Sequence, residues 1–368
     1  MTDTQDAPAP LLKEIFDRAR LRHLADETRA VYPAFDAARF LELASRDLDA
    51  LSIMQRLRQI AQAYGETLPK DFDAAVAILT ALIPRINHRF VTLVPPEFVA
   101  LYGLDHFDTS MAALKTFTPY GSAEFAIRPF LRQDLSRTLK VMEAWTRDPD
   151  EHVRRLASEG SRPRLPWSFR LDALVQDPTP ALPILDALKT DDSAYVRKSV
   201  ANHLNDITKD HPDRVLEHFK TWPLDDKRSA WIAKHALRGL IKHGDPRALA
   251  VIGATEGADV RAEHFTIQPA AIRLGEAIAL STRLAETGGR AQTLVVDYAI
   301  TYPKASGRAS RKVFKWKGVQ IAAGQRLDLA LRQTIKDFTT RKHAPGRHAV
   351  ELLVNGQVVA QAAFDLSI

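Results

Sequence analysis

The sequence contains no cysteine, which excludes disulfide bonds, thiolate zinc sites and cysteine nucleophiles. No uncharged run is long enough to cross a bilayer, and residues 1–10 lack the basic start and apolar stretch of a secretion signal. The histidines lack metal-ligand spacing, and there is no glycine-rich phosphate loop. We therefore expect no membrane contact, no metal, no cofactor and a cytoplasmic location.

Length and charge describe a folded protein with an uneven charge distribution. A chain of 368 residues with 45% hydrophobic and 26% charged residues suits two or three domains. Residues 259–368 hold 16 Lys and Arg against 9 Asp and Glu, whereas residues 1–258 hold 35 against 36. The basic excess therefore lies in the C-terminal segment. Positive charge concentrated in one segment suits a nucleic-acid partner.

Residues 11 to about 253 have the periodicity of successive helices. One apolar stripe recurs at helical spacing in Ile53, Leu57, Ile60, Ala61 and Tyr64. A phrase with an acidic cap, a Val-Arg pair and small residues occupies 148–157, returns at 191–201, and recurs more loosely at 227–236. Val153 and Val196 are 43 positions apart, a period typical of HEAT-like repeats. We predict an α-solenoid.

The period changes to alternation after Gly253. Leu294, Val296, Tyr298 and Ile300 alternate with other residues, as half-buried strands do. Asn355-Gly356 between two alternating runs predicts a tight hairpin. The expected fold class is mainly α with a β domain: a disordered N-terminus at 1–10, a HEAT-like repeat domain at 11–255 and an immunoglobulin-like β-sandwich at 260–368.

The segment that follows the first repeat phrase is the most informative. We expect its helix to end at Glu159 with Gly160 as the cap, so that Arg162, Arg164 and Trp167 project beside a carboxylate. In the alternative interpretation, the tryptophan packs between repeats and the arginines are solvated. The clustering of these residues favours a functional role.

Three phrases resemble those of one family. Residues 155–167, 120–130 and 196–206, the last followed by the helix at 231–240, are similar to the AlkC branch of the AlkC/AlkD HEAT-repeat DNA glycosylases. The resemblance covers most of the chain. The Trp-Asp pair of AlkD is absent from residues 122–130, which fits the AlkC branch.

The resemblance implies hydrolysis of the N-glycosidic bond of cationic alkylated bases in duplex DNA, with 3-methyladenine and 3-methylcytosine expected, and without flipping of the base. It implies that the catalytic residues are Glu124, Glu159, Asp206 and Trp167. A cationic base leaves without a general acid, so carboxylates and an aromatic face would stabilise the developing sugar cation. Alternatively, Glu124 is a first-turn helix acid after the cap Ser122, and Asp206 forms a salt bridge to a neighbouring repeat.

Basic residues recur at equivalent repeat positions and suit contacts to DNA phosphates. The predicted set in the helical region is Arg154, Arg155, Arg162, Arg164, Arg197, Lys198, Lys234 and Arg238. Because one residue of each Val-Arg pair often forms an inter-repeat salt bridge in HEAT proteins, we expect the set to divide between the two roles.

The predicted sandwich carries two basic segments, at 304–317 and 339–347, and the resemblance implies that this domain clamps DNA. The predicted DNA-binding residues there are Arg308, Arg311, Lys312, Arg341 and Lys342. Phe314 and Trp316 are expected in the core.

The leading interpretation is a monomeric, monofunctional alkyl-base DNA glycosylase that acts on alkylated duplex DNA. The main alternative is a non-catalytic HEAT-repeat scaffold that binds DNA, and a weaker one is a protein-interaction solenoid. Only a glycosylase needs three acids gathered around one exposed tryptophan, and this requirement separates the interpretations.

Overall fold

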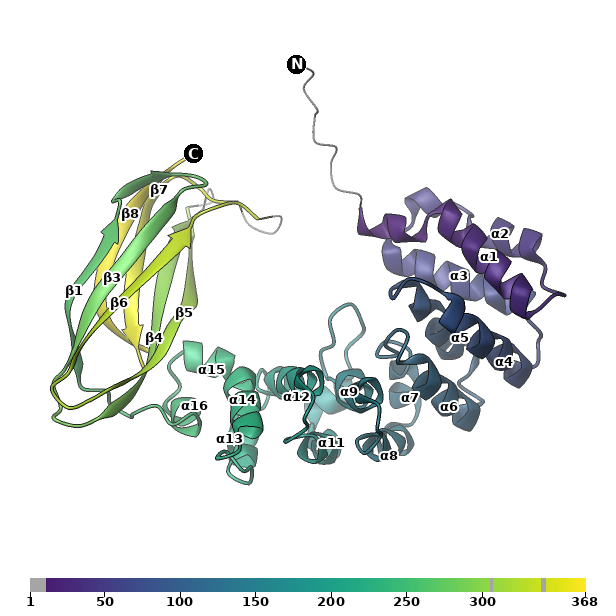
Figure 1. The fold of residues 1–368 in the computed structure, drawn as a ribbon, viewed down its shortest axis with the longest axis horizontal. Helices are drawn as coiled ribbons and strands as arrows, with labels where there is room; N and C mark the ends of the chain where they lie inside the picture. The colour runs from purple at the N-terminus through teal and green to yellow at the C-terminus, as the bar shows by residue number, and fades with distance from the viewer. Residues whose placement is uncertain (1–10, 305–306, 339–341) are drawn as a thin grey trace, which may run out of the picture. The chain divides into compact units, whose positions relative to one another are not determined.

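The computed structural model describes residues 11–304, 307–338 and 342–368 (Figure 1). Within these residues the chain forms helices first and strands afterwards, which confirms the predicted fold class. The α-helices are α1 (Arg18–Val31), α2 (Ala37–Ala44), α3 (Ile53–Thr67), α4 (Phe72–Leu82), α5 (Val94–Tyr102), α6 (Phe107–Phe117), α7 (Arg128–Gln133), α8 (Leu135–Trp145), α9 (Glu151–Gly160), α10 (Asp172–Gln176), α11 (Leu182–Ala187), α12 (Ala194–Ile207), α13 (Pro212–Phe219), α14 (Lys227–Ala236), α15 (Arg238–Lys242) and α16 (Pro246–Val251). The strands are β1 (Val260–Gln268), β2 (Ala271–Arg273), β3 (Ala277–Glu286), β4 (Gln292–Pro303), β5 (Ala309–Ile321), β6 (Arg326–Thr334), β7 (Gly346–Val354) and β8 (Gln357–Ser367).

Two compact units make up the chain, one to Asp210 and one from His211 onward. The change from helix to strand falls between Val251 and Val260, so helices α13–α16 belong to the second unit together with the strands. The predicted domain limits at 255 and 260 stay predictions, and residues 1–10 lie outside the described part of the chain.

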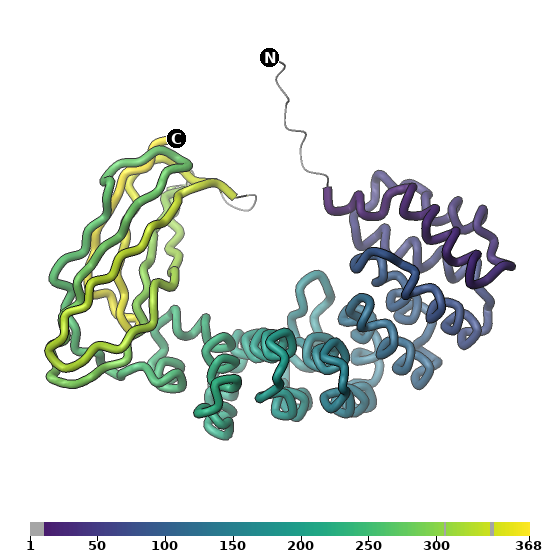
Figure 2. The backbone as a smooth tube through the Cα atoms, viewed as in Figure 1, coloured from purple at the N-terminus to yellow at the C-terminus, as the bar shows by residue number. Residues whose placement is uncertain are grey.

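Polar caps and apolar faces form the helical repeats of the first unit. Asp150 Oδ1 accepts a hydrogen bond of 2.7 Å from the backbone N–H of His152 at the start of α9, and Ser193 caps α12. Helix α9 packs against α12, and α3 packs against α5, so that the backbone winds through successive helices that lie against one another (Figure 2). Val153 and Val196, the equivalent residues of the two repeat phrases, are both buried.

Gly160 has a different role from the predicted one. Helix α9 runs through Glu159 and Gly160, and Ser161 is the residue that caps it. A Cβ atom at Gly160 would lie 2.5 Å from Ile127 Cγ2. The prediction of a capping glycine is therefore wrong, because the glycine is needed for close packing of the helix end against the segment before α7.

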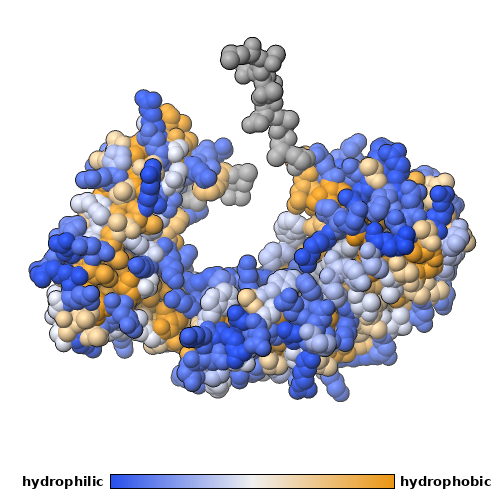
Figure 3. Space-filling view, in the orientation of Figure 1, coloured by the Kyte–Doolittle hydropathy of each residue, from blue (hydrophilic) through white to orange (hydrophobic). Residues whose placement is uncertain are grey.

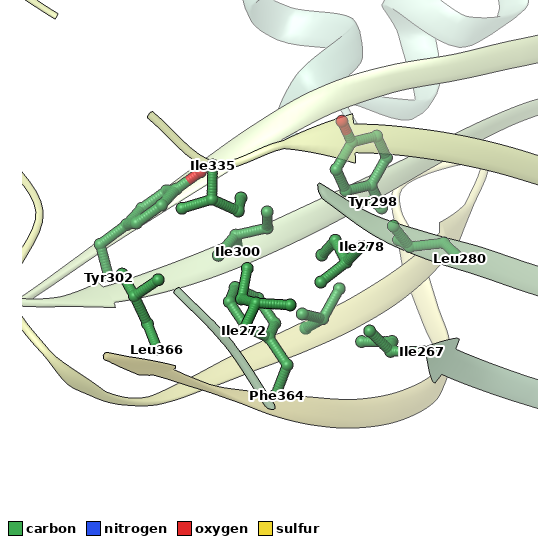
Figure 4. Close-up of a cluster of buried hydrophobic side chains, with 11 residues drawn as sticks. Ile267, Ile272, Ile278, Leu280, Tyr298, Ile300, Tyr302, Ile335, Phe364 and Leu366 are labelled. Carbon is green, nitrogen blue, oxygen red and sulfur yellow. The ribbon is translucent and has the colours of Figure 1, made fainter. Parts of the chain in front are cut away.

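Two sheets face each other in the second unit. One has the antiparallel order β1-β3-β6, and the other has the order β2-β8-β7-β4-β5, in which only β2 and β8 are parallel. Buried side chains from both sheets form the core between them (Figure 4). This core includes Ile278 from the first sheet and Ile300 and Phe364 from the second.

The predicted hairpin at Asn355-Gly356 is confirmed. Both residues have positive φ angles, 46° and 79°, as a type I′ turn between β7 and β8 requires. A Cβ atom at Gly356 would lie 2.1 Å from the Cα atom of Gly244, so the turn packs closely against the helices of its own unit. Asn355 Nδ2 reinforces this contact by donating a 2.7 Å hydrogen bond to the carbonyl of Thr255.

Hydrophilic residues cover much of the face in Figure 3, with hydrophobic residues in scattered groups. None of the helices in the described residues combines the length and the apolar character that crossing a bilayer requires.

Candidate functional site

A cleft of about 410 Å³ opens in the first unit and brings together three of the four predicted catalytic residues. Its walls come from the segments before α5 and before α7, from α9 and the loop that follows it, and from the start of α12. The lining residues are Arg89, Phe90, Leu93, Gly121, Ser122, Glu124, Phe125, Arg155, Glu159, Arg162, Leu165, Pro166, Trp167 and Tyr195.

Glu124 lies on one side of this cleft in a turn before α7. Its Oε2 atom accepts hydrogen bonds from Arg155 Nη1 at 2.6 Å and from Ser122 Oγ at 2.8 Å. In the described residues its Oε1 atom has no such partner, so this oxygen is available to a bound molecule. The predicted alternative, an acid in the first turn of a helix, is wrong, because α7 begins four residues later at Arg128.

Glu159 forms the floor of the cleft and is 6% exposed. Its Oε1 atom accepts a 2.7 Å hydrogen bond from Arg162 Nη1, and Arg155 Nη2 lies 3.6 Å away. Ser199 Oγ donates a 2.6 Å hydrogen bond to its Oε2 atom. The helix α9 and these donors from two further segments fix the orientation of the carboxylate.

Asp206 lies behind the cleft and does not line it. It is 2% exposed, and its Oδ2 atom accepts a 2.8 Å hydrogen bond from Arg162 Nε, while Lys209 Nζ donates to Oδ1 at 2.8 Å. The salt-bridge alternative stated for Asp206 thus describes its observed contacts. One guanidinium, that of Arg162, connects Asp206 to Glu159.

Trp167 lies on the rim with 61% of its surface exposed. Its backbone has a φ of 66°, an uncommon conformation for a residue with a large side chain. The ring of Phe90 contacts it edge-on, with 6.4 Å between ring centroids. The predicted alternative, in which the tryptophan packs between repeats, is wrong.

Arg128 holds the loop that carries Arg162 and Trp167. This arginine is fully buried, and it donates hydrogen bonds to the carbonyls of Gly160 at 2.9 Å, Arg162 at 2.7 Å and Phe169 at 2.5 Å. Burial lowers the pKa of its guanidinium to about 10. The three bonds tie both ends of the loop to the start of α7.

The predicted phosphate-binding residues of the first unit differ in their contacts within the protein. Arg154 donates to both carboxylate oxygens of Asp191, at 2.7 and 3.1 Å, and Arg164 forms a similar pair with Asp210. Arg197 donates to two backbone carbonyls that precede its own helix. These three guanidinium groups are engaged within the protein, whereas Lys198 is exposed on α12.

In the second unit most predicted DNA-binding residues are exposed. Lys234, Arg308 and Lys312 are exposed; Arg311 pairs with Glu351 at 2.6 Å, and Lys342 pairs with Asp337 at 3.2 Å. Arg238 donates a 2.6 Å hydrogen bond to the carbonyl of His235. Arg341 lies outside the described residues.

Phe314 and Trp316, which were expected in the core, are partly buried at its edge, where both rings contact the buried Tyr298.

Sequence reasoning missed Arg128 and Tyr195. Tyr195 lines the cleft, and its ring lies 4.7 Å from the guanidinium carbon of Arg155. Arg128 stands inside residues 120–130, which the resemblance already singled out, and Tyr195 lies in the repeat phrase at 191–201. Among the described residues, no group of His, Asp and Glu has the geometry of a metal site.

Comparison with known proteins finds two family models that match different parts of the chain. Residues 117–240 match the model described as "DNA alkylation repair enzyme", and residues 261–368 match the C-terminal Ig-like domain of the uncharacterised protein YhaZ. The chain is 40% identical over 348 residues to the uncharacterized protein YhaZ of Bacillus subtilis (strain 168), covering 94% of this chain and 97% of that protein.

A solved structure is similar along nearly the whole chain. It is the alkylpurine DNA glycosylase AlkC of Pseudomonas fluorescens, bound to DNA containing an abasic site analog, with 54% identity and a TM-score of 0.93. The similarity covers 98% of this chain and all of that one. The chain therefore belongs to the AlkC family of DNA alkylation repair proteins, as its sequence motifs predicted.

Proposed function

We propose that this protein is a DNA glycosylase that hydrolyses the N-glycosidic bond of cationic alkylated bases in duplex DNA. One observation carries the proposal: Glu124 and Glu159 border the same cleft as the exposed, strained Trp167. The similarity to an alkylpurine DNA glycosylase bound to DNA supports it further.

The chemistry that this cleft suits needs no general acid. The base carries a positive charge, so the bond from C1′ to the base nitrogen breaks heterolytically and the base leaves neutral. The sugar then holds the positive charge, and water adds to C1′ and loses a proton to give an abasic site. Carboxylates near C1′ lower the energy of this cation and accept the proton.

The two cleft carboxylates suit different parts of this reaction. Glu159 is held by Arg162 and Ser199, so we assign it the fixed negative charge below the sugar. Glu124 has an uncommitted Oε1 atom within the described residues, which suits it to orient the attacking water. Trp167 would present its ring face to the sugar or the lesion.

Asp206 is assigned a positioning role. Because it contacts Arg162 and not the cleft, it would act by fixing the guanidinium that orients Glu159. The substrates that the proposal expects are 3-methyladenine and 3-methylcytosine, cleaved without flipping, so that selectivity depends on the weakened glycosidic bond of the lesion more than on pocket shape.

Base release from methylated duplex DNA tests the proposal. Wild type should release methylated bases, and Glu124→Gln and Glu159→Gln should lower the single-turnover rate constant roughly 100-fold or more. Asp206→Asn should have a smaller effect. Glu143→Gln, which changes an exposed acid on α8, serves as the control. Wild type that releases no base from any alkylated duplex would overturn the proposal in favour of a DNA-binding scaffold.

A further inference from the structure

A second groove lies beside the cleft in the first unit. It has a volume of about 320 Å³ and lies between α3, α5 and the loop after α9. Phe125 and Trp167 line both spaces. The groove therefore continues the surface on which the proposed substrate would lie, and its volume falls in the range of ligand pockets.

Aromatic rings form one part of the groove wall. Trp167 is largely exposed, and the neighbouring Phe169 is 36% exposed. The guanidinium carbon of Arg132 lies 4.4 Å from the centroid of the Phe169 ring, and that of Arg128 lies 5.4 Å away, so two cations hold the ring in position. Positioned aromatic rings of this kind bind flat apolar faces by stacking.

Glu97 supplies the polar end of the groove. Its side chain is 15% exposed, and its nearest cation is Arg58 Nη1 at 3.8 Å from Oε1, beyond hydrogen-bond distance. No hydrogen bond to this carboxyl group is present within the described residues. A largely buried carboxyl group that lacks a donor is costly, and a bound N–H group would remove that cost.

We propose that this groove receives an undamaged nucleobase of the bound DNA, unstacked from its neighbours, with its rings against Trp167 and Phe169 and its amino edge toward Glu97. The inference rests on the proposed function and adds a second base-binding site to it. A nucleobase combines two stacking faces with exocyclic N–H donors, and this matches the groove. A phosphate matches less of the groove, because it could contact Arg58 but has no flat face for the rings and is repelled by the Glu97 carboxylate.

Binding of modified duplexes tests this assignment. The duplex carries a neutral abasic analogue in place of the lesion, and each nucleotide beside or opposite it is replaced in turn by a second abasic nucleotide. We expect wild type to lose about tenfold in affinity at one of these positions, which corresponds to one hydrogen bond to a charged group. For Glu97→Gln the loss at that position should fall to about threefold or less.

Two further variants make the result specific. Phe169→Leu should reduce the same loss, whereas Glu66→Gln, an exposed acid on α3 that pairs with Lys70, should leave it unchanged. Equal losses in wild type and Glu97→Gln at every position would overturn the assignment. Base excision by wild type is measured in parallel and separates the two proposals. If wild type excises bases but Glu97→Gln does not change the affinity loss, only the groove assignment is overturned. If Glu97→Gln changes the affinity loss but wild type excises no base, only the proposed activity is overturned.

Discussion

Arg155 and Glu124 form an ion pair of 2.6 Å at the side of the cleft, and the same guanidinium lies 3.6 Å from Glu159. One arginine thus stands between two carboxylates that would otherwise repel each other in a partly buried site. The ring of Tyr195 covers this guanidinium and limits its movement. The charge arrangement of the cleft therefore depends on Arg155 as much as on the acids.

Arg155→Met should destabilise the fold. The substitution leaves Glu124 and Glu159 without their shared cation, and removing one partner of a buried ion pair costs about 3 kcal/mol. Urea unfolding measures the free energy of unfolding, and Arg29→Met, in an exposed pair with Asp26, should change it by less than about 1 kcal/mol. Similar values for the two variants would mean that Arg155 does not organise the cleft.

Arg128→Met should release the loop after α9. Three backbone carbonyls lose a charged donor, and each such bond contributes roughly 1.5 to 3 kcal/mol. We expect a lower free energy of unfolding together with a loss of base release, because Arg162 and Trp167 lose their positions. Arg128→Met protein that is destabilised yet releases bases at the wild-type rate constant would show that the loop has no part in the activity.

Substitution of Arg154 should change stability, whereas substitution of Lys198 should change DNA binding. Arg154→Ala breaks a pair with Asp191 and should lower stability, while the salt dependence of DNA binding stays unchanged. Lys198→Ala should leave stability unchanged and reduce the slope of log affinity against log salt by about 1, as expected for one phosphate contact. An unchanged slope for Lys198→Ala would remove this lysine from the DNA-binding surface.

His203 should make the protein acid-sensitive. This histidine is fully buried, and burial lowers its pKa from the ordinary 6.5 to about 4. As pH falls, this histidine takes up a proton in the unfolded chain before it does so in the folded protein. Its contribution to the free energy of unfolding is therefore complete above pH 6.5 and is lost as pH falls toward 4. The free energy of unfolding should be measured for wild type and for His203→Asn across this pH window. The difference between the two values should decrease by roughly 1 kcal/mol for each pH unit as pH falls. A constant difference would contradict the lowered pKa.

Much of the fold and part of the site could be predicted from the sequence. The repeat phrases and the alternating runs specify local structure, because capping, helical period and strand period act over short distances. The hairpin at Asn355-Gly356 follows from backbone preferences alone. The grouping of Glu124, Glu159 and Trp167 in one cleft agrees with the predicted site.

Long-range partners could not be predicted. The choice of Arg154 for Asp191 and the position of Asp206 behind Arg162 depend on how separate repeats meet, which spacing does not encode. The bonds of Arg128 to a distant loop appear only in the folded chain. Glu97 carried no sequence signal, since its importance comes from burial without a donor.

The most direct test of the central claim compares two analogues of the reacting sugar. A duplex with a cationic pyrrolidine abasic analogue resembles the charged transition state, and a duplex with a neutral tetrahydrofuran analogue does not. Wild type should bind the cationic duplex about 100-fold more tightly, and Glu159→Gln should lose most of that preference while Glu143→Gln keeps it. Equal binding of both duplexes by wild type would contradict the account, because the cleft would then have no selectivity for positive charge at the sugar.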